Sequence, residues 1–474
     1  MGRRPGHFTL LCISSAVTFT ALLIYSITLA PGLTWANFGG DGGELVTAAV
    51  TLGVPHPPGY PTYILLGKLF SFLPMGTAAF RLNLMSAVAA ASAAGVVSAT
   101  ALIWLKQAQR PSEGLTTHLA AASAGLAFAF VPAVWSQAVI AEVYTLNLLF
   151  LALFLFLLLT HQRPMLTGFF LGLSITTHLT SLLVLPLALI LSPAGRRRRL
   201  LPGMLLGLTP FLLIPWLAGR DSPVIWGNPA TWHGFWWLVS GRIYWNNALS
   251  LPVADLGPRL WRWGTAMLRH LTWIWLPLII AGYEAMPNET RRRARLMALT
   301  ASGAFVYTIG YNTADAQVLI LPAVLLLTLL LAWGLSQMGW LAPLLPLTLL
   351  LLNFNQQDLS KTQQARPLIQ SLLAEVPQDA VLITSGNQII FPLWYFQHVE
   401  GLRPDVVLVD ADLFAFDWYR QRLGQQQPEL TTLAADNLPA FKQENRRLHV
   451  VCEATLKGGT QPVQPIVKCL QRAD

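Results

Sequence analysis

Long apolar runs separated by short polar loops fill the first three quarters of the chain. A helix of about 20 apolar residues crosses a hydrocarbon layer about 30 Å thick. The pattern predicts membrane spans at residues 8–30, 81–105, 116–134, 142–160, 200–218, 268–285, 296–311, 316–333 and 337–353. The apolar segments 41–53 and 60–74 are shorter, so we expect two short helices that lie along the membrane.

Basic residues predict the orientation of these spans. They gather in short loops that contain Arg3 and Arg4, Lys106 and Arg110, Arg163, Arg196–Arg199, and Arg291–Arg295. Loops rich in Lys and Arg stay in the cytoplasm, so the loop at residues 31–60 is expected outside.

The segment 165–192 lies between two of the basic loops and is too short for two full spans. We therefore expect two short helices that enter and return, and that meet near residues 176–181. The alternative is one long tilted helix with His178 satisfied inside it. With the entering and returning pair, the total is about eleven crossings, with a cytoplasmic N-terminus and an external C-terminus.

The pattern changes near residue 355, where charged residues and short β-type runs begin. Runs at 381–384 and 406–409 predict buried strands, and periodic segments at 364–375, 388–400 and 414–424 predict helices. The sequence thus predicts a mainly α-helical polytopic membrane domain at 1–354 and a soluble external α/β domain at 355–474. An external location permits a disulfide between Cys452 and Cys469, and two unpaired buried cysteines are the alternative.

Composition agrees with an integral membrane protein. Of the 474 residues 54% are hydrophobic and only 11% are charged, whereas a soluble protein carries about 25% charged residues. The mean hydropathy is +0.51. The net charge of +9 is accounted for by the basic loops, so no nucleic-acid partner is expected.

Two carboxylates follow the first predicted span. Asp41 and Glu44 are three positions apart and would share one face of a helix. Acidic groups at a membrane face are costly to desolvate, which points to a function, and either carboxylate could act as general base toward a hydroxyl. The alternative is a helix N-cap at Asp41 with Glu44 completing a capping box.

A proline-rich turn comes next. The segment from His56 to Pro61 cannot form helix interior, because its prolines fix φ and remove backbone donors. This stiff corner could present His56, and with it Tyr60, to a cavity. The alternative is a rigid turn without chemistry.

Further polar residues near the expected external face are candidates for binding the donor substrate. They are Lys68, Arg81, Glu142, Tyr144, His178, Arg242 and Asp315. Cations among them could bind a lipid phosphate, with ordinary snorkelling as the alternative. Glu142 could equally be an acid favoured by a helix start.

Several of these motifs together resemble the protein O-mannosyltransferase-like family, long filed as a domain of unknown function, within the GT-C superfamily of membrane glycosyltransferases. The matching segments are Asp41–Glu44, Gly53–Pro61, Arg81–Asn83, Trp135–Ala138, Ala141–Asn147, Gly172–His178, Phe391–Tyr395 and Arg403–Val406. The resemblance implies a GT-C fold, an acidic catalytic residue in the first external loop, and a polyprenyl-phosphate sugar as donor. Two glycines separate Asp41 from Glu44 here, which departs from the family pattern.

The resemblance therefore implies an inverting glycosyltransferase at the external or periplasmic face of a plasma membrane of the bacterial inner-membrane type. Its partners would be membrane lipid, a polyprenyl-phosphate sugar such as a mannose carrier, and a protein, lipid or glycan acceptor. We expect no cofactor and no essential metal, because a leaving phosphate monoester needs less metal assistance than a diphosphate. A multi-span transporter or flippase of lipid-linked sugars is the alternative, and a non-catalytic scaffold is a third.

Overall fold

A computed structural model describes residues 6–108, 114–160, 163–270, 272–456 and 465–472. Arg3, Arg4 and Arg110 of the predicted basic loops lie outside the described residues. The chain forms two compact units, each described below by itself. The first unit contains residues 1–29, 83–211 and 241–360, and the second contains residues 30–82, 212–240 and 361–474. The predicted domain boundary near residue 354 stays a prediction.

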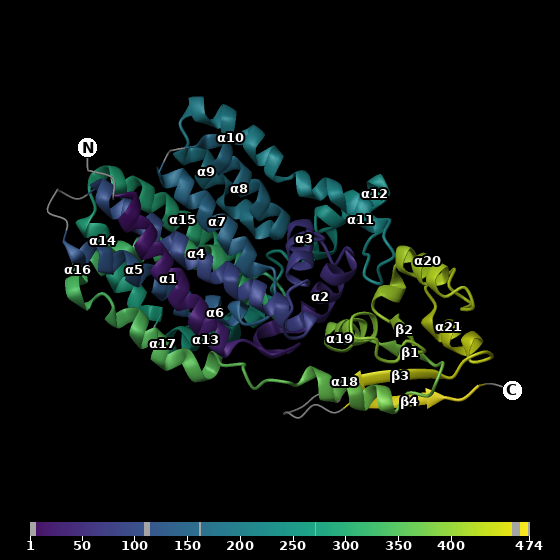
Figure 1. The fold of residues 1–474 in the computed structure, drawn as a ribbon. Coiled ribbons are helices and arrows are strands. Elements are labelled where there is room, and N and C mark those ends of the chain that lie inside the picture. Colours follow the sequence, from purple (N-terminus) through teal and green to yellow (C-terminus); the bar gives the residue numbers. More distant parts are fainter. Residues whose placement is uncertain (1–5, 109–113, 161–162, 271, 457–464, 473–474) are drawn as a thin grey trace. The chain divides into compact units, whose positions relative to one another are not determined.

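The first unit is a helical bundle (Figure 1). Its helices and 3-10 turns are α1 (His7–Thr28), α4 (Ala78–Ala108, which begins in the second unit), α5 (Leu115–Phe130), α6 (Pro132–Ala138), α7 (Tyr144–Thr160), α8 (Pro164–Thr177), η2 (Leu179–Val184), α9 (Leu185–Leu191), α10 (Ala194–Gly207), η3 (Thr209–Leu213, at the unit boundary), η4 (Arg242–Asn247), α13 (Val253–Arg269), η5 (Thr272–Ile274), α14 (Trp275–Ala285), α15 (Asn288–Gly310), η6 (Ala316–Ile320), α16 (Leu321–Met338), η7 (Gly339–Leu341) and α17 (Leu344–Gln357).

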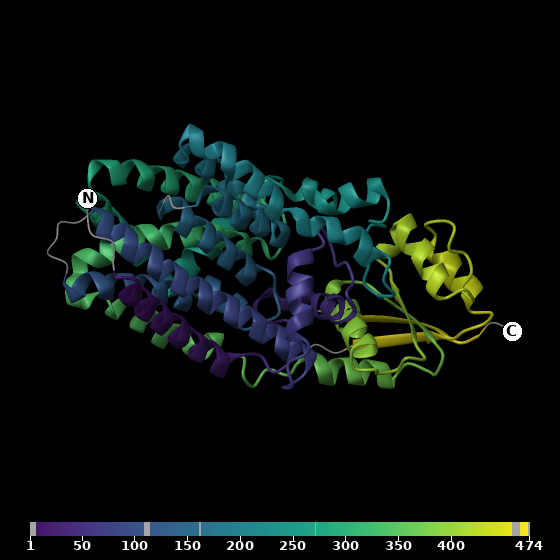
Figure 2. The same cartoon turned by 45° about the horizontal axis from the view of Figure 1, so that its top comes forward.

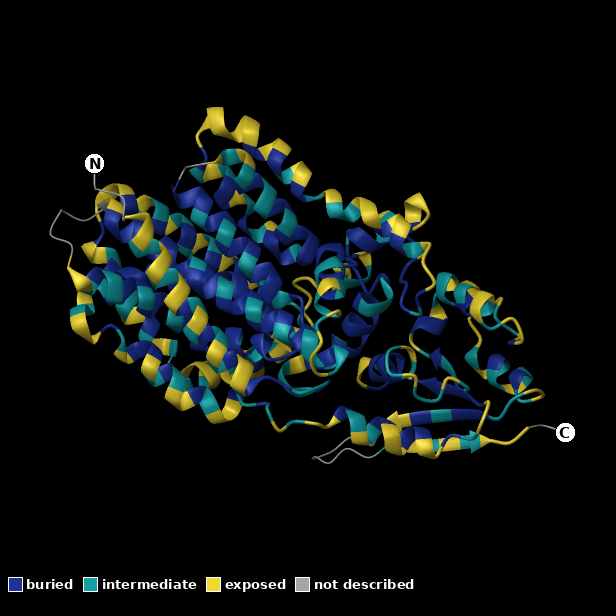
Figure 3. Ribbon diagram, viewed as in Figure 1, coloured by how far each residue is buried: buried dark blue, intermediate teal, exposed yellow. Residues whose placement is uncertain are grey.

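Burial separates inner from outer helices in this bundle. In the described part of the chain, four helices are long and apolar enough to cross a membrane, or five if the bent pair α5–α6 is one span. The apolar windows of α4 and of the helix at Ala316–Leu341 are 83% and 89% buried, whereas that of α1 is only 17% buried. Figure 3 shows this contrast as dark inner ribbons and a yellow-striped α1. The outer apolar surface suits lipid contact, which supports an integral membrane protein. The predicted number of about eleven crossings stays a prediction.

Close backbone contact joins α8 to α10, which lie side by side in both ribbon views (Figures 1 and 2). Glycines at 168 and 172 face glycines at 203 and 207, and a Cβ added at any of the four would come within about 2 Å of the other helix's carbonyl oxygens. Small residues spaced in this way let helix backbones approach inside a membrane.

The segment 165–192 is interrupted, as predicted. α8 ends at Thr177, His178 is extended (φ −165°, ψ 133°), and η2 and α9 follow. The Thr180 N–H donates to Nδ1 of His178 at 3.3 Å, which caps the second segment. The alternative of one continuous tilted helix is therefore wrong.

The second unit combines the first inter-span loop with the C-terminal α/β domain. Its elements are η1 (Ala36–Asp41), α2 (Gly42–Thr51), α3 (Pro61–Phe70), α11 (Ile214–Ala218), α12 (Trp232–Val239), α18 (Ala365–Ala374), β1 (Val381–Thr384), α19 (Asn387–His398), β2 (Val407–Asp410), η8 (Leu413–Ala415), α20 (Asp417–Gln426), α21 (Leu438–Asn445), β3 (Val451–Leu456) and β4 (Pro465–Leu470). The predicted short helices near 41–53 and 60–74 correspond to α2 and α3.

The sheet of this unit has the order β2-β1-β3-β4. β1 is parallel to β2 and to β3, and β4 is antiparallel to β3. Inward side chains such as Val381, Val409 and Val451 form its core with Phe414 and Phe441. The two predicted strands and three predicted helices are confirmed within a few residues, whereas β3, β4 and α21 were not predicted.

Cys452 and Cys469 form a disulfide. They lie directly opposite each other in the antiparallel β3–β4 pair. The bond ties the last strand to the parallel part of the sheet, and the alternative of two unpaired buried cysteines is wrong.

Candidate active site

Asp41 lies at a tight turn that begins α2. The preceding 3-10 turn has positive φ at Asn37 (58°) and Phe38 (64°), which turns the chain sharply before the helix. Asp41 occupies the N-cap position, but its side chain makes no cap hydrogen bond. The capping-box interpretation is therefore wrong, and the Asp41 carboxylate, 31% exposed, is left available to other groups.

Glu44 has a different environment, because its side chain is completely buried. Its Oε1 accepts a hydrogen bond from the backbone N–H of His56 at 3.1 Å, and its Oε2 makes a short hydrogen bond to Nδ1 of the same residue. Burial raises the pKa of the Glu44 carboxyl above its ordinary value, and the contacts with His56 act in the opposite direction. Glu44 thus orients the imidazole and has no access to solvent.

The second nitrogen of His56 points toward two further groups. Its Nε2 lies 3.8 Å from Oδ2 of Asp41 and 3.0 Å from the Tyr60 hydroxyl. Because the Glu44 carboxylate binds the Nδ1 side, we assign the proton to Nδ1, so the Nε2 lone pair accepts from the Tyr60 O–H. The result is a Glu44–His56–Asp41 series joined by an ordered imidazole.

The proline-rich turn positions this imidazole. Gly59 and Tyr60 both have positive φ, at 85° and 42°. The turn is held by a parallel bridge between Val54 and Ile225, in which Val54 N–H donates to Val224 O at 2.8 Å. The stiff corner therefore presents His56 to the carboxylates. The prediction that it presents His56 to a cavity, and the alternative of a turn without chemistry, both stay open.

The C-terminal part of the chain adds a group that the sequence did not reveal. Asn387, at the start of α19, donates from Nδ2 to Oδ1 of Asp41 at 3.1 Å. The two residues are 346 positions apart, and a lone exposed Asn after a Gly carries no signal of such a contact.

The absence of a side chain at Gly43 lets α19 pack close to α2. A Cβ added at Gly43 would lie 2.5 Å from the carbonyl carbon and oxygen of Phe391. Gly43 is thus a position where the α19 backbone packs directly on α2.

Aromatic rings surround the outer side of His56. The Trp226 ring is 6.2 Å from the imidazole centroid and 5.9 Å from the Trp418 ring. Trp237 and Phe416 extend this cluster, with ring centroids 6.0 Å apart. The sequence analysis assigned no function to these rings, which supply an apolar border beside the imidazole.

A buried acid lies at the carboxyl end of β2. Burial raises the pKa of Asp410 to about 7, although backbone N–H groups of Leu413 and Asp412 bind its carboxylate and act against that rise. The neighbouring Asp412 carboxylate accepts from Ser385 Oγ and from Gly386 N–H, each at 2.7 Å. These bonds fix the loop that leads into α19.

Two cations that were predicted to bind the sugar donor instead donate hydrogen bonds to backbone carbonyls of the same unit. Lys68 donates to Val50 O at 2.6 Å. Arg81 donates to Met75 O, Ser71 O and Gly76 O at 2.8, 2.5 and 3.1 Å. Both cations therefore stabilise the loops around α3, and their role toward a donor stays a prediction.

The other predicted residues belong to the first unit. Tyr144 and His178 have ring centroids 5.1 Å apart, and Glu142 is buried with its backbone N–H donating to Ser86 Oγ at 3.3 Å. Arg242 is exposed on η4, and Asp315 precedes η6. The structure thus brings Tyr144 and His178 together, and the donor-binding role of all these residues stays a prediction.

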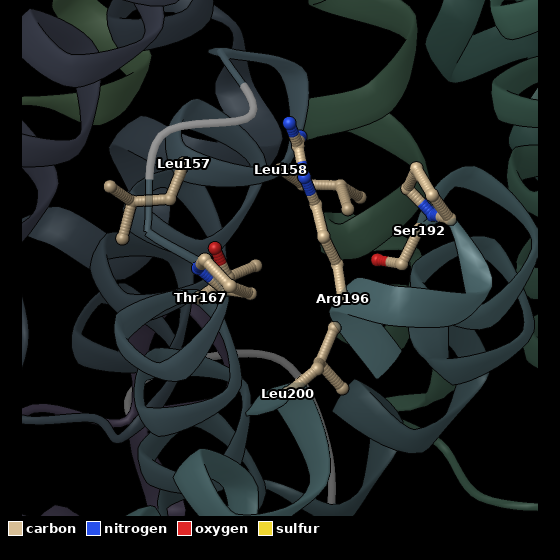
Figure 4. A pocket seen from close by; sticks show the side chains of 8 residues that line it. Leu157, Leu158, Thr167, Ser192, Arg196 and Leu200 are labelled. Carbon is tan, nitrogen blue, oxygen red and sulfur yellow. The ribbon is translucent and has the colours of Figure 1, made fainter. Parts of the chain in front are cut away.

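Two cavities provide a contrast with this site. One, shown in Figure 4, lies between the ends of α7, α8 and α10 and is lined by Leu157, Leu158, Pro164, Thr167, Ser192, Pro193, Arg196 and Leu200. Its volume is about 10 Å³, room for one water at most. The other, about 110 Å³, is lined in part by Arg366 and Glu400, which are already paired at 2.6 Å. Neither cavity is lined by Asp41, Glu44 or His56.

Comparison with known proteins gives a consistent family. Residues 41–199 match the family described as "Protein O-mannosyl-transferase TMEM260 N-terminal domain", and residues 365–459 match "TMEM260-associated domain 2". The "Protein O-mannosyl-transferase TMEM260" of Mus musculus is 26% identical over 88% of this chain and 65% of its own length. The Dictyostelium discoideum protein of that name is 22% identical over 87% of this chain and 58% of its own length. The chain therefore spans about two thirds or less of these relatives.

The fold is similar to a solved membrane protein. ArnT from Cupriavidus metallidurans, in a crystal structure with undecaprenyl phosphate bound, superposes with a TM-score of 0.56 at 12% identity. The alignment covers 98% of both chains. Its apo structure gives a TM-score of 0.54. The two domain matches, the relatives and this fold together support a protein of the GT-C, O-mannosyltransferase-like kind.

Proposed function

We propose that this protein transfers a sugar from a polyprenyl-phosphate carrier to a hydroxyl acceptor, with inversion at the anomeric carbon. The observation that carries the proposal is the pair of unlike carboxylates around His56. Asp41 is partly exposed and bound on one oxygen only by a neutral amide, whereas Glu44 is buried and bound to the imidazole. Two acids in such different environments suit two different roles.

Asp41 acts as the general base. Its carboxylate accepts the acceptor's hydroxyl proton as the hydroxyl oxygen attacks the anomeric carbon. The new carbon–oxygen bond forms on the face opposite the phosphate, and the carbon–oxygen bond to the phosphate breaks, so the carrier leaves as polyprenyl phosphate. A positioned base of this kind contributes about 10²–10⁴-fold to a rate.

His56 and Glu44 border the base. The buried Glu44 fixes the imidazole through Nδ1, and Nε2 then faces Asp41 and Tyr60. Arg and His groups on the external side would stabilise the leaving phosphate electrostatically. The candidates for this role are Lys68, Arg81, His178 and Arg242, with Tyr60, Glu142, Tyr144 and Asp315 as polar contacts to the donor.

The relatives support the substrate class. The relatives from Mus musculus and Dictyostelium discoideum are named as protein O-mannosyl-transferases, which favours mannose as the sugar and a protein hydroxyl as the acceptor. ArnT binds undecaprenyl phosphate, which favours a polyprenyl carrier. We propose the external or periplasmic face of a plasma membrane, with a cytoplasmic N-terminus, and the Cys452–Cys469 disulfide supports an oxidising compartment for the α/β domain. No metal is required by this scheme.

The test uses the purified full chain in lipid with a panel of radiolabelled polyprenyl-phosphate sugars. A membrane extract serves as acceptor, and wild type is compared with Asp41→Asn. Transfer by wild type that is lost in a folded Asp41→Asn variant is the expected result. Carrier movement between leaflets without any transfer would contradict the proposal and favour a flippase.

A further inference from the structure

A residue of the C-terminal α/β domain, Asn387, donates a hydrogen bond to the Asp41 carboxylate. We propose that Asn387 is a positioning residue for the general base, so that the α/β domain completes the active site. This inference rests on the proposed function and deepens it.

The two oxygens of the Asp41 carboxylate have different neighbours. Asn387 Nδ2 donates to Oδ1 of Asp41 at 3.1 Å, while Oδ2 faces His56 Nε2 at 3.8 Å. Asp41 makes no side-chain cap bond to its own helix, so α2 does not fix the carboxylate plane. The donor bond from the Asn387 amide therefore orients the carboxylate, and the other oxygen stays on the side of the imidazole.

The backbone that flanks Asn387 is held by hydrogen bonds on both sides. Trp35 Nε1 donates to the backbone carbonyl of Gln388 at 3.0 Å, one residue further on. Ser385 Oγ and Gly386 N–H, two residues and one residue before Asn387, both donate to the Asp412 carboxylate at 2.7 Å. The backbone on both sides of Asn387 is therefore anchored without any help from its own side chain.

α19 also packs closely against α2, the helix that begins between Asp41 and Glu44. A Cβ at Gly43 would lie 2.5 Å from backbone atoms of Phe391, one turn beyond Asn387. Two helices in such contact have little freedom to slide, so the amide stays opposite Asp41.

The chemistry of the amide is also specific. The charged and titratable groups that face Asp41 are the His56 ring and, behind it, Glu44, while Asp412 binds the loop before α19. An amide donates to the carboxylate without adding charge or titrating. An aspartate at 387 has the same shape, cannot donate when ionised, and would add a second negative charge. Shape and donor capacity can therefore be separated by substitution.

The experiment compares Asn387→Asp and Asn387→Ala with wild type in the full chain, using the labelled donor that wild type transfers. We expect kcat to fall about 10²-fold in Asn387→Asp and about tenfold in Asn387→Ala, with the KM for donor within about twofold. The acidic limb of the pH–rate profile of Asn387→Asp should move to higher pH, because a second carboxylate favours proton binding at the base.

Gln388→Ala is the matched control, because Gln388 is the exposed neighbour on the same helix and its bond to Trp35 is made by its backbone carbonyl. It should keep wild-type kcat. An Asn387→Asp variant with wild-type kcat and pH profile would overturn the inference while the proposed function stands. Asn387 variants that lose activity only through a higher KM would also overturn it. A wild type that transfers no sugar would overturn both.

Discussion

Replacing Gly43 by Ala should separate α19 from α2 and impair catalysis more than stability. The new Cβ would meet the Phe391 carbonyl carbon and oxygen at 2.5 Å and Pro392 N at 2.7 Å, all of them backbone atoms that cannot rotate away. Ordinary contact begins near 3.4 Å, so the two helices must move apart by about 0.9 Å. That displacement acts one turn from Asn387, which binds Asp41.

Two terms set the expected stability change. Overpacking costs about 1–3 kcal/mol, and the higher helix propensity of Ala returns about 1 kcal/mol. The net loss of unfolding free energy should therefore not exceed about 2 kcal/mol. A displacement of about 1 Å near the reacting groups costs up to about 10²-fold in rate, so transfer should fall by roughly 10- to 100-fold.

The assay measures initial transfer rates from the labelled donor and unfolding by urea on the same preparations. Gly40→Ala is the control, because a Cβ at Gly40 meets nothing within 4 Å and the same residue type is replaced three positions away. Gly40→Ala should transfer at a rate close to wild type. If Gly43→Ala also transfers at the wild-type rate, then close contact of α19 with α2 does not hold the base in position.

Three further predictions concern other parts of the second unit. Tyr60→Phe removes the hydroxyl 3.0 Å from His56 Nε2, so stability should fall by about 1 kcal/mol and transfer by up to about tenfold, measured by urea unfolding and initial rates; an unchanged rate would refute the contact's importance. The pKa of Asp410 is raised to about 7 by burial, so its contribution to stability is complete below about pH 4 and is lost as the pH rises to about 7. Asp410→Asn should flatten that pH dependence of the urea midpoint, and an unaltered slope would show that the acid is not the cause. Replacing both Cys452 and Cys469 by Ser opens a loop with a sequence separation of 17 and should lower the unfolding free energy by about 2–4 kcal/mol. Reduction of wild type should have the same effect, and an unchanged free energy in both cases would contradict the prediction.

Much of the fold could be predicted because apolar length and period are local properties. The interruption at His178 follows from a segment that is too short for two spans between two basic loops, and the structure has it. β1 and β2 are short apolar runs that the sequence predicts as strands, and their parallel pairing comes from the structure. β4 alternates partly buried and exposed residues at a sheet edge, close to the end of the described chain, and gives a weaker signal.

The site was harder to predict from the sequence than the fold. The sequence places Asp41, Glu44 and His56 within 16 residues of chain, and the stiff proline turn begins at His56. All three could therefore be named as candidates, but the contact between them was not predicted. Their unequal burial is not local, since it depends on α19 covering α2 from the far end of the chain. The alternative of a capping box is wrong because Asn387 binds the Asp41 side chain and His56 binds the Glu44 side chain.

The measurement that tests the central claim most directly compares Asp41→Asn with Glu44→Gln in single-turnover transfer, with donor binding measured on the same samples. The account predicts that Asp41→Asn binds donor as wild type does and transfers about 10²–10⁴-fold more slowly. Glu44→Gln keeps the base and should be the more active of the two in whatever fraction folds. Wild-type turnover by Asp41→Asn, with loss of turnover in a folded Glu44→Gln, would contradict the assignment and make Glu44 the base.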